Sequence, residues 1–236
     1  MRILALETSA KSVSCAVVED GAVLSRSFQN TGLTHSRTLL PMVDAMLQNA
    51  ELPLESVGLC AVAAGPGSFT GLRIGVSALK GLAWTADKPC VGVSTLEAMA
   101  RNLAHLDGAL LVCAMDARRE QVYNALFEAN GGVLKRLCPD RAISLEELAK
   151  ELRSDARKKV VLGDGAALAH GYLTQNGVAC ALAPEALRHQ DAVGVALAAA
   201  DAAARGEVCS AQELSIAYLR PSQAERERAK REATQH

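Results

Sequence analysis

Aromatic residues are scarce in this chain of 236 residues, where phenylalanine, tyrosine and tryptophan together account for only 3%. Half of the residues are nevertheless apolar, and most of these are alanine, leucine or valine. A recognition surface rich in aromatic side chains is therefore not expected. Small and branched apolar residues instead favour buried helices and parallel strands, in one large domain or two small ones.

A large excess of positive charge is also missing, because 25 lysines and arginines are balanced by 26 aspartates and glutamates. No basic block is large enough to neutralise many phosphates, so autonomous binding of nucleic acid is not expected. The most basic segment, residues 220–231, alternates positive and negative side chains. This pattern predicts a charged, solvated helical tail.

Long apolar runs are absent too, since none reaches the roughly 18 residues of a membrane span, and we expect no signal peptide. The chain contains seven cysteines, an odd number, and no two of them form a Cys-x-x-Cys pair. Cysteines scattered through apolar strands predict buried, reduced thiols. The five histidines show no metal-ligand spacing. These features together predict a cytoplasmic protein.

Glycine is concentrated in one stretch, Ala64 to Gly75, which follows an apolar strand predicted at 57–64. A strand, a glycine turn and a helix commonly bind phosphate at the helix N-terminus. A Walker A loop is excluded because Gly71 is followed by leucine and arginine instead of Lys-Ser/Thr. Pro66 also removes a backbone N–H from the turn. A loose dinucleotide motif and a turn for close helix packing both stay open.

The predicted elements repeat along the chain, which indicates a duplication with a cleft between its halves. The first half has strands at 3–8, 13–19, 22–28, 57–64 and 90–93, and helices at 35–50, 72–86 and 94–104. The second half has strands at 109–115, 121–128, 133–137, 160–163 and 178–182, and helices at 145–153, 166–175 and 191–204. Pro41 predicts either a kink or a later start of the first helix.

The duplicated unit, with strands that end in Glu7-Thr8-Ser9 and Asp116-Ala117-Arg118, resembles the actin, hexokinase and Hsp70 superfamily. The resemblance implies an α/β fold of duplicated actin-like (ribonuclease H-like) domains, each a mixed sheet flanked by helices. We expect the first domain at residues 1–105, with the partner-binding helices. The second is expected at residues 106–236, with the charged tail.

Within that superfamily, the glycine stretch, Gly92 to Glu97, Met115 to Tyr123 and Ile216 to Pro221 resemble the universal tRNA threonylcarbamoyladenosine (t6A) family. The similarity spans nearly the whole chain and points to a smaller bacterial member that lacks catalytic activity. The catalytic member, TsaD, has His-Leu-Glu-Gly-His where this chain has Thr95-Leu96-Glu97-Ala98-Met99. Both metal-ligand positions are lost, so no metal site is expected.

The resemblance also implies a nucleotide cleft, from which this sequence departs. The first phosphate loop contains no glycine, and Asp164 brings a carboxylate to the adenosine loop, where it would repel a phosphate. We therefore expect a relict cleft without a cofactor; ADP or ATP at an interface with the catalytic subunit stays open. The relict-cleft residues are Glu7, Thr8, Ser9, Asp116, Gly163, Asp164 and Gly165.

The same resemblance implies a subunit that binds TsaD through the helices at 34–50 and 72–86. It would thereby permit threonylcarbamoyl transfer to the adenosine beside the anticodon. The second helix is apolar nearly all round, which predicts burial on more than one side. The predicted partner-binding residues are Leu39, Met42, Met46, Gly71, Leu72, Arg73, Gly75, Val76, Ala78, Leu79 and Leu82. The ATPase TsaE is expected to dock on the same assembly. The chain is expected to form a homodimer when TsaD is absent, and to contact tRNA only through the complex.

Two enzymatic alternatives stay open. A glycoprotease-like hydrolase would use Ser9, Ser68 or Ser94 as its nucleophile, although no histidine is adjacent and no Gly-x-Ser-x-Gly elbow is present. A kinase of the same superfamily would require the phosphate and adenosine loops that are altered here. Tight ATP binding by the isolated protein would favour the kinase.

Overall fold

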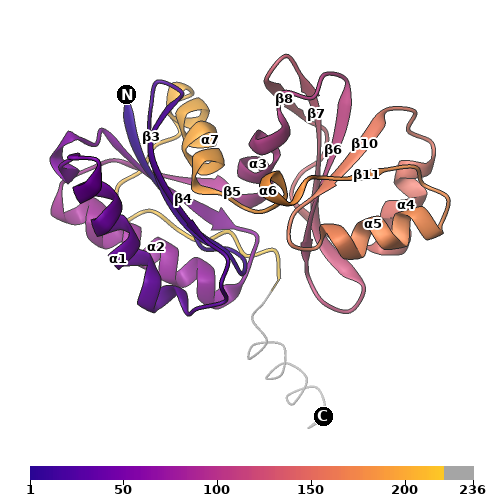
Figure 1. Cartoon of the computed structure of the whole chain (residues 1–236), viewed down its shortest axis with the longest axis horizontal. Coiled ribbons are helices and arrows are strands. Elements are labelled where there is room, and N and C mark those ends of the chain that lie inside the picture. Colours follow the sequence, from indigo (N-terminus) through magenta and orange to yellow (C-terminus); the bar gives the residue numbers. More distant parts are fainter. Residues whose placement is uncertain (221–236) are drawn as a thin grey trace, which may run out of the picture.

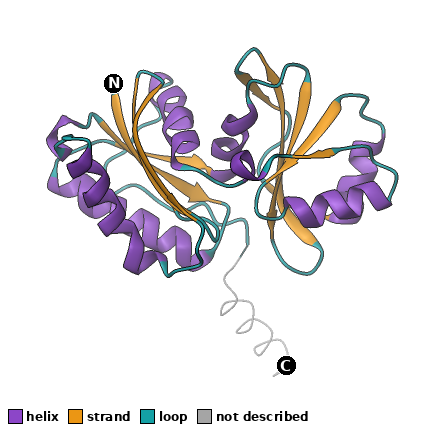
Figure 2. Cartoon of the chain, in the orientation of Figure 1, coloured by secondary structure: helices purple, strands orange, loops and turns teal. Residues whose placement is uncertain are grey.

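The computed structural model describes residues 1–220, which form two mixed sheets side by side (Figures 1 and 2). The predicted charged tail, apart from Arg220, lies outside the described residues. The first sheet contains β1 (Arg2–Glu7), β2 (Val13–Glu19), β3 (Ala22–Gln29), β4 (Leu59–Gly65) and β5 (Cys90–Ser94). The second contains β6 (Ala109–Asp116), β7 (Gln121–Asn130), β8 (Val133–Arg136), β10 (Lys158–Leu162) and β11 (Ala181–Leu182), with β9 (Arg141–Ser144) paired to β7.

The two sheets have the same topology. The strand order is β3-β2-β1-β4-β5 in the first and β8-β7-β6-β10-β11 in the second. In each, the hairpin strands pair antiparallel and the last three strands pair parallel. The predicted duplication is therefore present, and the predicted fold class, two mixed sheets flanked by helices, is confirmed.

Helices cover both faces of the first sheet. Leu4 and Leu6 of β1 face α1 (His35–Asn49) and α2 (Phe69–Thr85), whereas Ile3 and Ala5 face α7 (Ala192–Ala204). This alternation follows from the two-residue period of a strand. Alanines dominate the α7 side, which lets that alanine-rich helix pack close to the sheet.

The second sheet is covered in the same way. One face packs on α3 (Thr95–Ala100), and the other on α4 (Leu145–Arg153) and α5 (Ala166–Gln175). Phe127 and Leu111 lie on the α3 side, and Leu110 and Val112 lie on the opposite side. A short helix, α6 (Glu185–Arg188), precedes α7.

The packing divides the chain differently from the expected boundary at residues 105 and 106. Helix α3, assigned by sequence to the first domain, packs its Leu96 and Met99 into the core of the second sheet. Helix α7, assigned to the second domain, packs on the first sheet. The two helices cross between the sheets, where a Cβ on Gly194 would lie 2.1 Å from the Ala98 carbonyl oxygen. Each half therefore completes its core with a helix that the contiguous boundary gave to the other.

Several element boundaries also differ from the prediction. Helix α2 begins at Phe69, three residues early, because the Ser68 side chain caps it by accepting a hydrogen bond from the Gly71 N–H. Gly71 and Gly75 are therefore helical and not part of a turn. Pro41 lies beyond the first turn of α1. Strand β9 and helix α6 were not predicted, whereas α4 and its capping box, Ser144 with Glu147, match the prediction.

After α7, residues 207–220 form an extended C-terminal strap, drawn yellow in Figure 1. Cys209 pairs with Cys90 at the edge of β5 through two backbone hydrogen bonds of 2.8 and 2.9 Å. Further along, the Ala217 N–H donates to the Ala64 carbonyl at 2.9 Å, and Arg220 donates to the Ala117 carbonyl in the second half. The strap thus connects the two halves beside the glycine-rich stretch.

Within residues 1–220, no helix combines the length and apolar character that crossing a membrane requires. All seven cysteines are free thiols in the structure, and four of them are buried as predicted: Cys15, Cys60, Cys90 and Cys113. The other three are only partly buried: Cys138, Cys180 and Cys209.

Candidate functional site

A cavity of about 590 Å³ lies between the two halves, at the carboxyl ends of β1, β4 and β6. Its lining combines the loop after β1, the start of α2, the β6–β7 loop and the strap. Ser9, Asp116 and Asp164 of the predicted relict cleft line it, so three distant segments meet there. The other lining residues are Ala10, Lys11, Pro66, Gly67, Ser68, Phe69, Met115, Ala117, Arg118, Tyr123, Ala217, Tyr218, Leu219 and Arg220.

Glu7 ends β1 beneath the cavity and is completely buried. Its Oε1 accepts a hydrogen bond of 2.5 Å from the Ser9 N–H, and its Oε2 has no partner within the described residues. Burial raises the pKa of Glu7 to about 7, and the charges of Asp191 and Asp164 raise it further, against the lowering effect of the Ser9 hydrogen bond. A carboxyl in this position is costly to ionise and does not face the cavity.

The space for a phosphate at the start of α2 is filled by the chain itself. The Ser68 N–H donates to the Ser9 carbonyl at 2.6 Å, and Thr8 Oγ1 donates to the Gly71 carbonyl at 2.8 Å. A Cβ on Gly67 would lie 2.6 Å from the Ser9 oxygen, and one on Gly71 would lie 2.1 Å from the Thr8 oxygen. These glycines therefore admit the neighbouring backbone, which is the close-packing interpretation that the sequence left open.

The loop between β10 and α5, predicted as the adenosine loop, is also filled by the backbone of the chain. Gly163 has a φ of +111°, and a Cβ there would lie 2.1 Å from the Ala114 carbonyl oxygen. The Gly165 N–H donates to that same oxygen at 3.1 Å. Gly163 and Gly165 thus pack β10 and α5 against β6 and do not border the cavity.

Two carboxylates occupy the part of the cavity where a nucleotide would require positive charge. The Gln190 side chain donates to Asp164 at 2.7 Å, and the Arg118 N–H donates to Asp116 at 2.7 Å. The protein around the cleft raises the pKa of Asp164 by desolvation, although the outer edge of that residue is open to solvent. Because the chain's own backbone fills these loops and two carboxylates line the cavity, the residues do not fit the nucleotide site of the superfamily.

The positions equivalent to the metal ligands of TsaD, Thr95 and Met99, are fully buried at the start of α3. Across residues 1–220, no group of three or more His, Cys, Asp or Glu side chains is arranged to hold a metal. The hydroxyls considered as nucleophiles are not paired with histidine: Ser68 and Ser94 cap helices, and Ser9 Oγ has no partner among the described residues.

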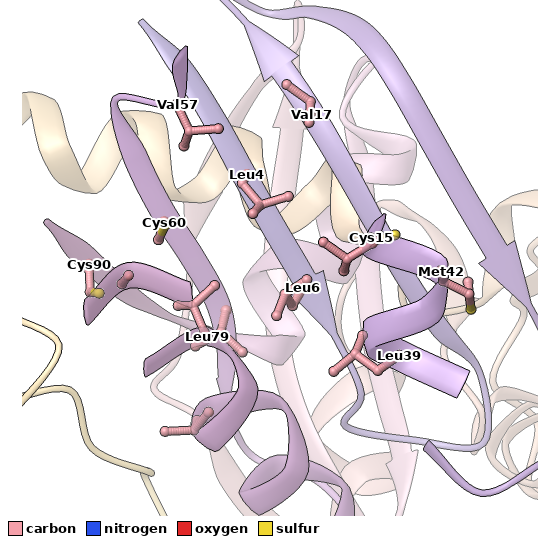
Figure 3. Close-up of a cluster of buried hydrophobic side chains, with 14 of the residues drawn as sticks. Leu4, Leu6, Cys15, Val17, Leu39, Met42, Val57, Cys60, Leu79 and Cys90 are labelled. Carbon is pink, nitrogen blue, oxygen red and sulfur yellow. The ribbon is translucent and has the colours of Figure 1, made fainter. Parts of the chain in front are cut away.

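Most of the predicted partner-binding residues point into the chain. Figure 3 shows Leu39 and Leu79 near Leu6 of β1, and Met42 near Cys15 of β2, all in one buried cluster. The buried members of the predicted set are Leu39, Met42, Met46, Gly71, Leu72, Gly75, Val76 and Leu79. Those that reach the surface at least in part are Arg73, Ala78 and Leu82. The buried side chains support the two helices from beneath and are not available to a partner.

A groove of about 650 Å³ lies on this side of the molecule, between α1 and residues 51–55, with Leu82 of α2 at its border. Leu40, Leu47 and Leu82 line it, and Leu40 is 49% exposed. Trp84, near the end of α2, is 72% exposed. The residues predicted from the sequence did not include Leu40, Leu47 and Trp84, because they were taken mainly from the stripe that faces the sheet.

Comparisons of the sequence with known proteins match proteins named for tRNA threonylcarbamoyladenosine modification. The family model described as TsaD, tRNA N6-adenosine threonylcarbamoyltransferase, matches residues 29–227. The tRNA threonylcarbamoyladenosine biosynthesis protein TsaB of Bacillus subtilis is 35% identical over 168 residues, which cover 71% of this chain and 73% of that protein. The protein of the same name in Escherichia coli is 40% identical over 129 residues, covering 54% and 55%.

A solved structure gives the same result in three dimensions. YeaZ from Pseudomonas aeruginosa superposes with a TM-score of 0.78 at 30% sequence identity. The superposition covers 92% of this chain and 99% of that chain.

Proposed function

The chain belongs to the TsaB/YeaZ family, and from that premise we propose that it is a non-catalytic subunit of the t6A tRNA modification machinery that docks on TsaD. The observation that carries the proposal is the exposed groove, lined by leucines, between α1 and residues 51–55, which Leu82 of α2 also borders. A monomeric surface rarely leaves such a groove uncovered. We infer that the helices of TsaD equivalent to α1 and α2 fill it and form a four-helix junction.

The outward stripe of α2 supports close contact with another helix. Its members are mostly small or short until the last turn: Thr70, Arg73, Ser77, Gly81 and Trp84. A Cβ on Gly81 would meet nothing within 4 Å, so packing inside this chain does not require a glycine there. Glycine in a helix interior lowers helix stability by about 1 kcal/mol, and a partner helix crossing at Gly81 would explain that cost.

The non-catalytic role is supported by the closed interior of the cleft. The chain's own backbone fills the space at the start of α2 and in the adenosine loop, and Thr95 and Met99 stand where TsaD carries its two histidines. We therefore propose that the transfer reaction takes place on TsaD and that this chain holds TsaD in its active arrangement. Neither a hydrolase nor a kinase is favoured by a specific observation.

Further parts of the proposal follow from the same surface and family. We propose that TsaE docks on the assembly, and that two copies of this chain pair through the same groove when TsaD is absent. A nucleotide at the junction with TsaD is compatible with these filled loops, because it would bind without entering the start of α2 or the adenosine loop of this chain. We infer a cytoplasmic location from the family.

Leu40→Glu is expected to weaken binding to TsaD at least tenfold while leaving the chain folded. Leu40 is half exposed, so the carboxylate is solvated in the free chain, but docking would bury it without a cationic partner. Isothermal titration of the purified chain with purified TsaD measures the effect. Circular dichroism of each variant verifies its fold.

Val133→Glu is the matched control, because Val133 is 68% exposed on β8 in the other half of the molecule. We expect this variant to bind TsaD as tightly as the unmodified chain. Equal binding by both variants would exclude the groove as the docking surface. No binding by the unmodified chain would exclude the proposed subunit role.

A further inference from the structure

Four cations gather around the mouth of the cleft without a close carboxylate partner. Elsewhere among residues 1–220, eight of eleven arginines have a carboxylate oxygen within 3.4 Å, and Arg37, Arg73 and Arg153 do not. The eight are Arg2, Arg26, Arg101, Arg136, Arg141, Arg157, Arg188 and Arg205. Lys11, Arg118 and Arg220 line the cavity, and Arg119 follows Arg118 in the β6–β7 loop. Arg118 lies 3.8 Å from Asp116, and the other three cations have no ion pair within the described residues. These cations remain available for an anionic ligand.

Aromatic side chains gather at the same place, although they are rare in the chain. Three of its six phenylalanines and tyrosines line the cavity: Phe69, Tyr123 and Tyr218. Phe69 and Tyr218 stack with ring centroids 4.9 Å apart and planes inclined by 26°. Tyr218 is 43% exposed, so part of its ring is open to a ligand.

Arginines hold these rings in position. The Arg73 guanidinium lies 3.9 Å above the Phe69 ring and donates a hydrogen bond of 3.1 Å to the Tyr218 hydroxyl. The Arg220 guanidinium lies 5.7 Å from the Tyr123 ring and donates to the Ala117 carbonyl and the Gln121 side chain. Among residues 1–220 the partners of Arg220 are neutral, so no described carboxylate cancels its positive charge.

The β6–β7 loop presents its cations in an unusual backbone conformation. Arg118, Arg119 and Glu120 have φ values of +67°, +54° and +56°, in the left-handed region that non-glycine residues rarely adopt. Three such residues in succession cost conformational energy and turn both arginines outward to solvent.

We propose that the mouth of this cleft binds single-stranded RNA, as part of the tRNA that TsaD modifies. Basic residues interleaved with exposed aromatic rings suit this ligand, because arginine pairs with phosphate and a ring stacks on a base. The acidic walls, Asp116 and Asp164, repel phosphate from the depth of the cavity, so the RNA backbone crosses the mouth. An acidic peptide would use the cations but not the stacked rings.

The inference rests on the proposed function, and it extends the expectation that tRNA is contacted only through the complex. A net charge of −1 provides little general attraction for RNA. We therefore assign the cleft a supporting contact within the assembly with TsaD. Phe69 and Arg73 belong to α2, so the RNA site adjoins the docking surface.

The test uses the full chain in complex with TsaD and, as probe, a fluorescein-labelled anticodon stem-loop RNA with an unmodified adenosine beside the anticodon. Fluorescence anisotropy measures its affinity at several salt concentrations. Arg118→Ala/Arg119→Ala is expected to raise Kd about tenfold and to reduce the salt slope by about 1.4, the value for two phosphate contacts on a single strand. Tyr218→Leu is expected to raise Kd about fivefold or more through lost stacking.

The matched control, Arg153→Ala/Lys158→Ala, removes the same charge from exposed positions at the other end of the second sheet. It is expected to leave Kd within about twofold, a small free-energy change typical of surface substitutions. Equal losses in the control and the cleft variants would overturn the site, as would unchanged binding in the cleft variants.

Complex formation is measured separately for every variant, which distinguishes a failure of docking from a failure of RNA binding. If the unmodified chain does not bind TsaD, the same titration is run on the chain alone. Affinity that falls in the cleft variants and not in the control would then still support the RNA site. Absence of RNA binding by the unmodified chain, both alone and with TsaD, would overturn it.

Discussion

Gly71→Ala is expected to lower the free energy of unfolding by about 4 kcal/mol or more, a large share of the stability of a typical domain. The added Cβ would lie 2.1 Å from the Thr8 carbonyl oxygen, which is backbone and cannot rotate away. The helix or the end of β1 would have to move, and the 2.8 Å hydrogen bond from Thr8 Oγ1 to the Gly71 carbonyl would be disturbed. Urea denaturation followed by circular dichroism measures the change.

Gly81→Ala is the matched control, since it makes the same substitution in the same helix where nothing lies within 4 Å. We expect it to raise the free energy of unfolding by about 0.5–1 kcal/mol, the helix propensity difference between the residues. A Gly71→Ala variant that unfolds at the same urea concentration as the unmodified chain would contradict the close packing of α2 on β1. The pair of variants thus separates steric crowding from helix propensity.

Glu7→Gln is expected to stabilise the fold above pH 7 and to have little effect near pH 4. Burial raises the pKa of Glu7 to about 7, so between its ordinary value of 4.5 and 7 the folded chain holds a proton that the unfolded chain releases. The contribution of Glu7 to the free energy of unfolding therefore has its full value below pH 4.5, and it is lost as the pH rises toward 7. The loss amounts to roughly 3 kcal/mol, at 1.36 kcal/mol per pKa unit.

Urea unfolding at pH 4.5, 6 and 8 measures this dependence. Glutamine cannot ionise, and its side-chain oxygen can still accept the hydrogen bond from the Ser9 N–H. Glu120→Gln, which removes an exposed carboxylate from the rim of the cleft, controls for the change in net charge. The same stability difference at pH 4.5 and pH 8 would show that Glu7 does not titrate as proposed.

The local elements of the fold could be predicted from the sequence because the interactions that define them are local. Helix α4 begins where Ser144 and Glu147 exchange hydrogen bonds, three residues apart, and both residues are visible in the sequence. Apolar runs such as Leu110 to Met115 predicted the buried strands, and the repeated order of elements predicted two sheets of equal topology. The loss of both histidines of the TsaD motif was equally visible, as Thr95 and Met99.

The orientation of α1 and α2 could not be predicted in the same way. Both helices carry apolar residues on more than one side, and periodicity alone does not tell which stripe faces the sheet. Only the packing shows that Leu39 is buried while its neighbour Leu40 lines the open groove. The prediction took most of its partner-facing residues from the buried stripe of these two helices.

The sequence by itself therefore determined most of the helices and strands, the duplication and the absence of the family's metal-ligand pair, since each depends on neighbouring residues or on a short motif. Tertiary structure alone decided that α7 packs on the first sheet and that α3 lies between the two sheets. It also decided which side of α1 and α2 is exposed and what lines the cleft. Lys11, Phe69, Arg118 and Tyr218 come from four distant segments. They meet because strand ends, a helix start and the strap converge between the two sheets, and such long-range convergence leaves no periodic signal in the chain.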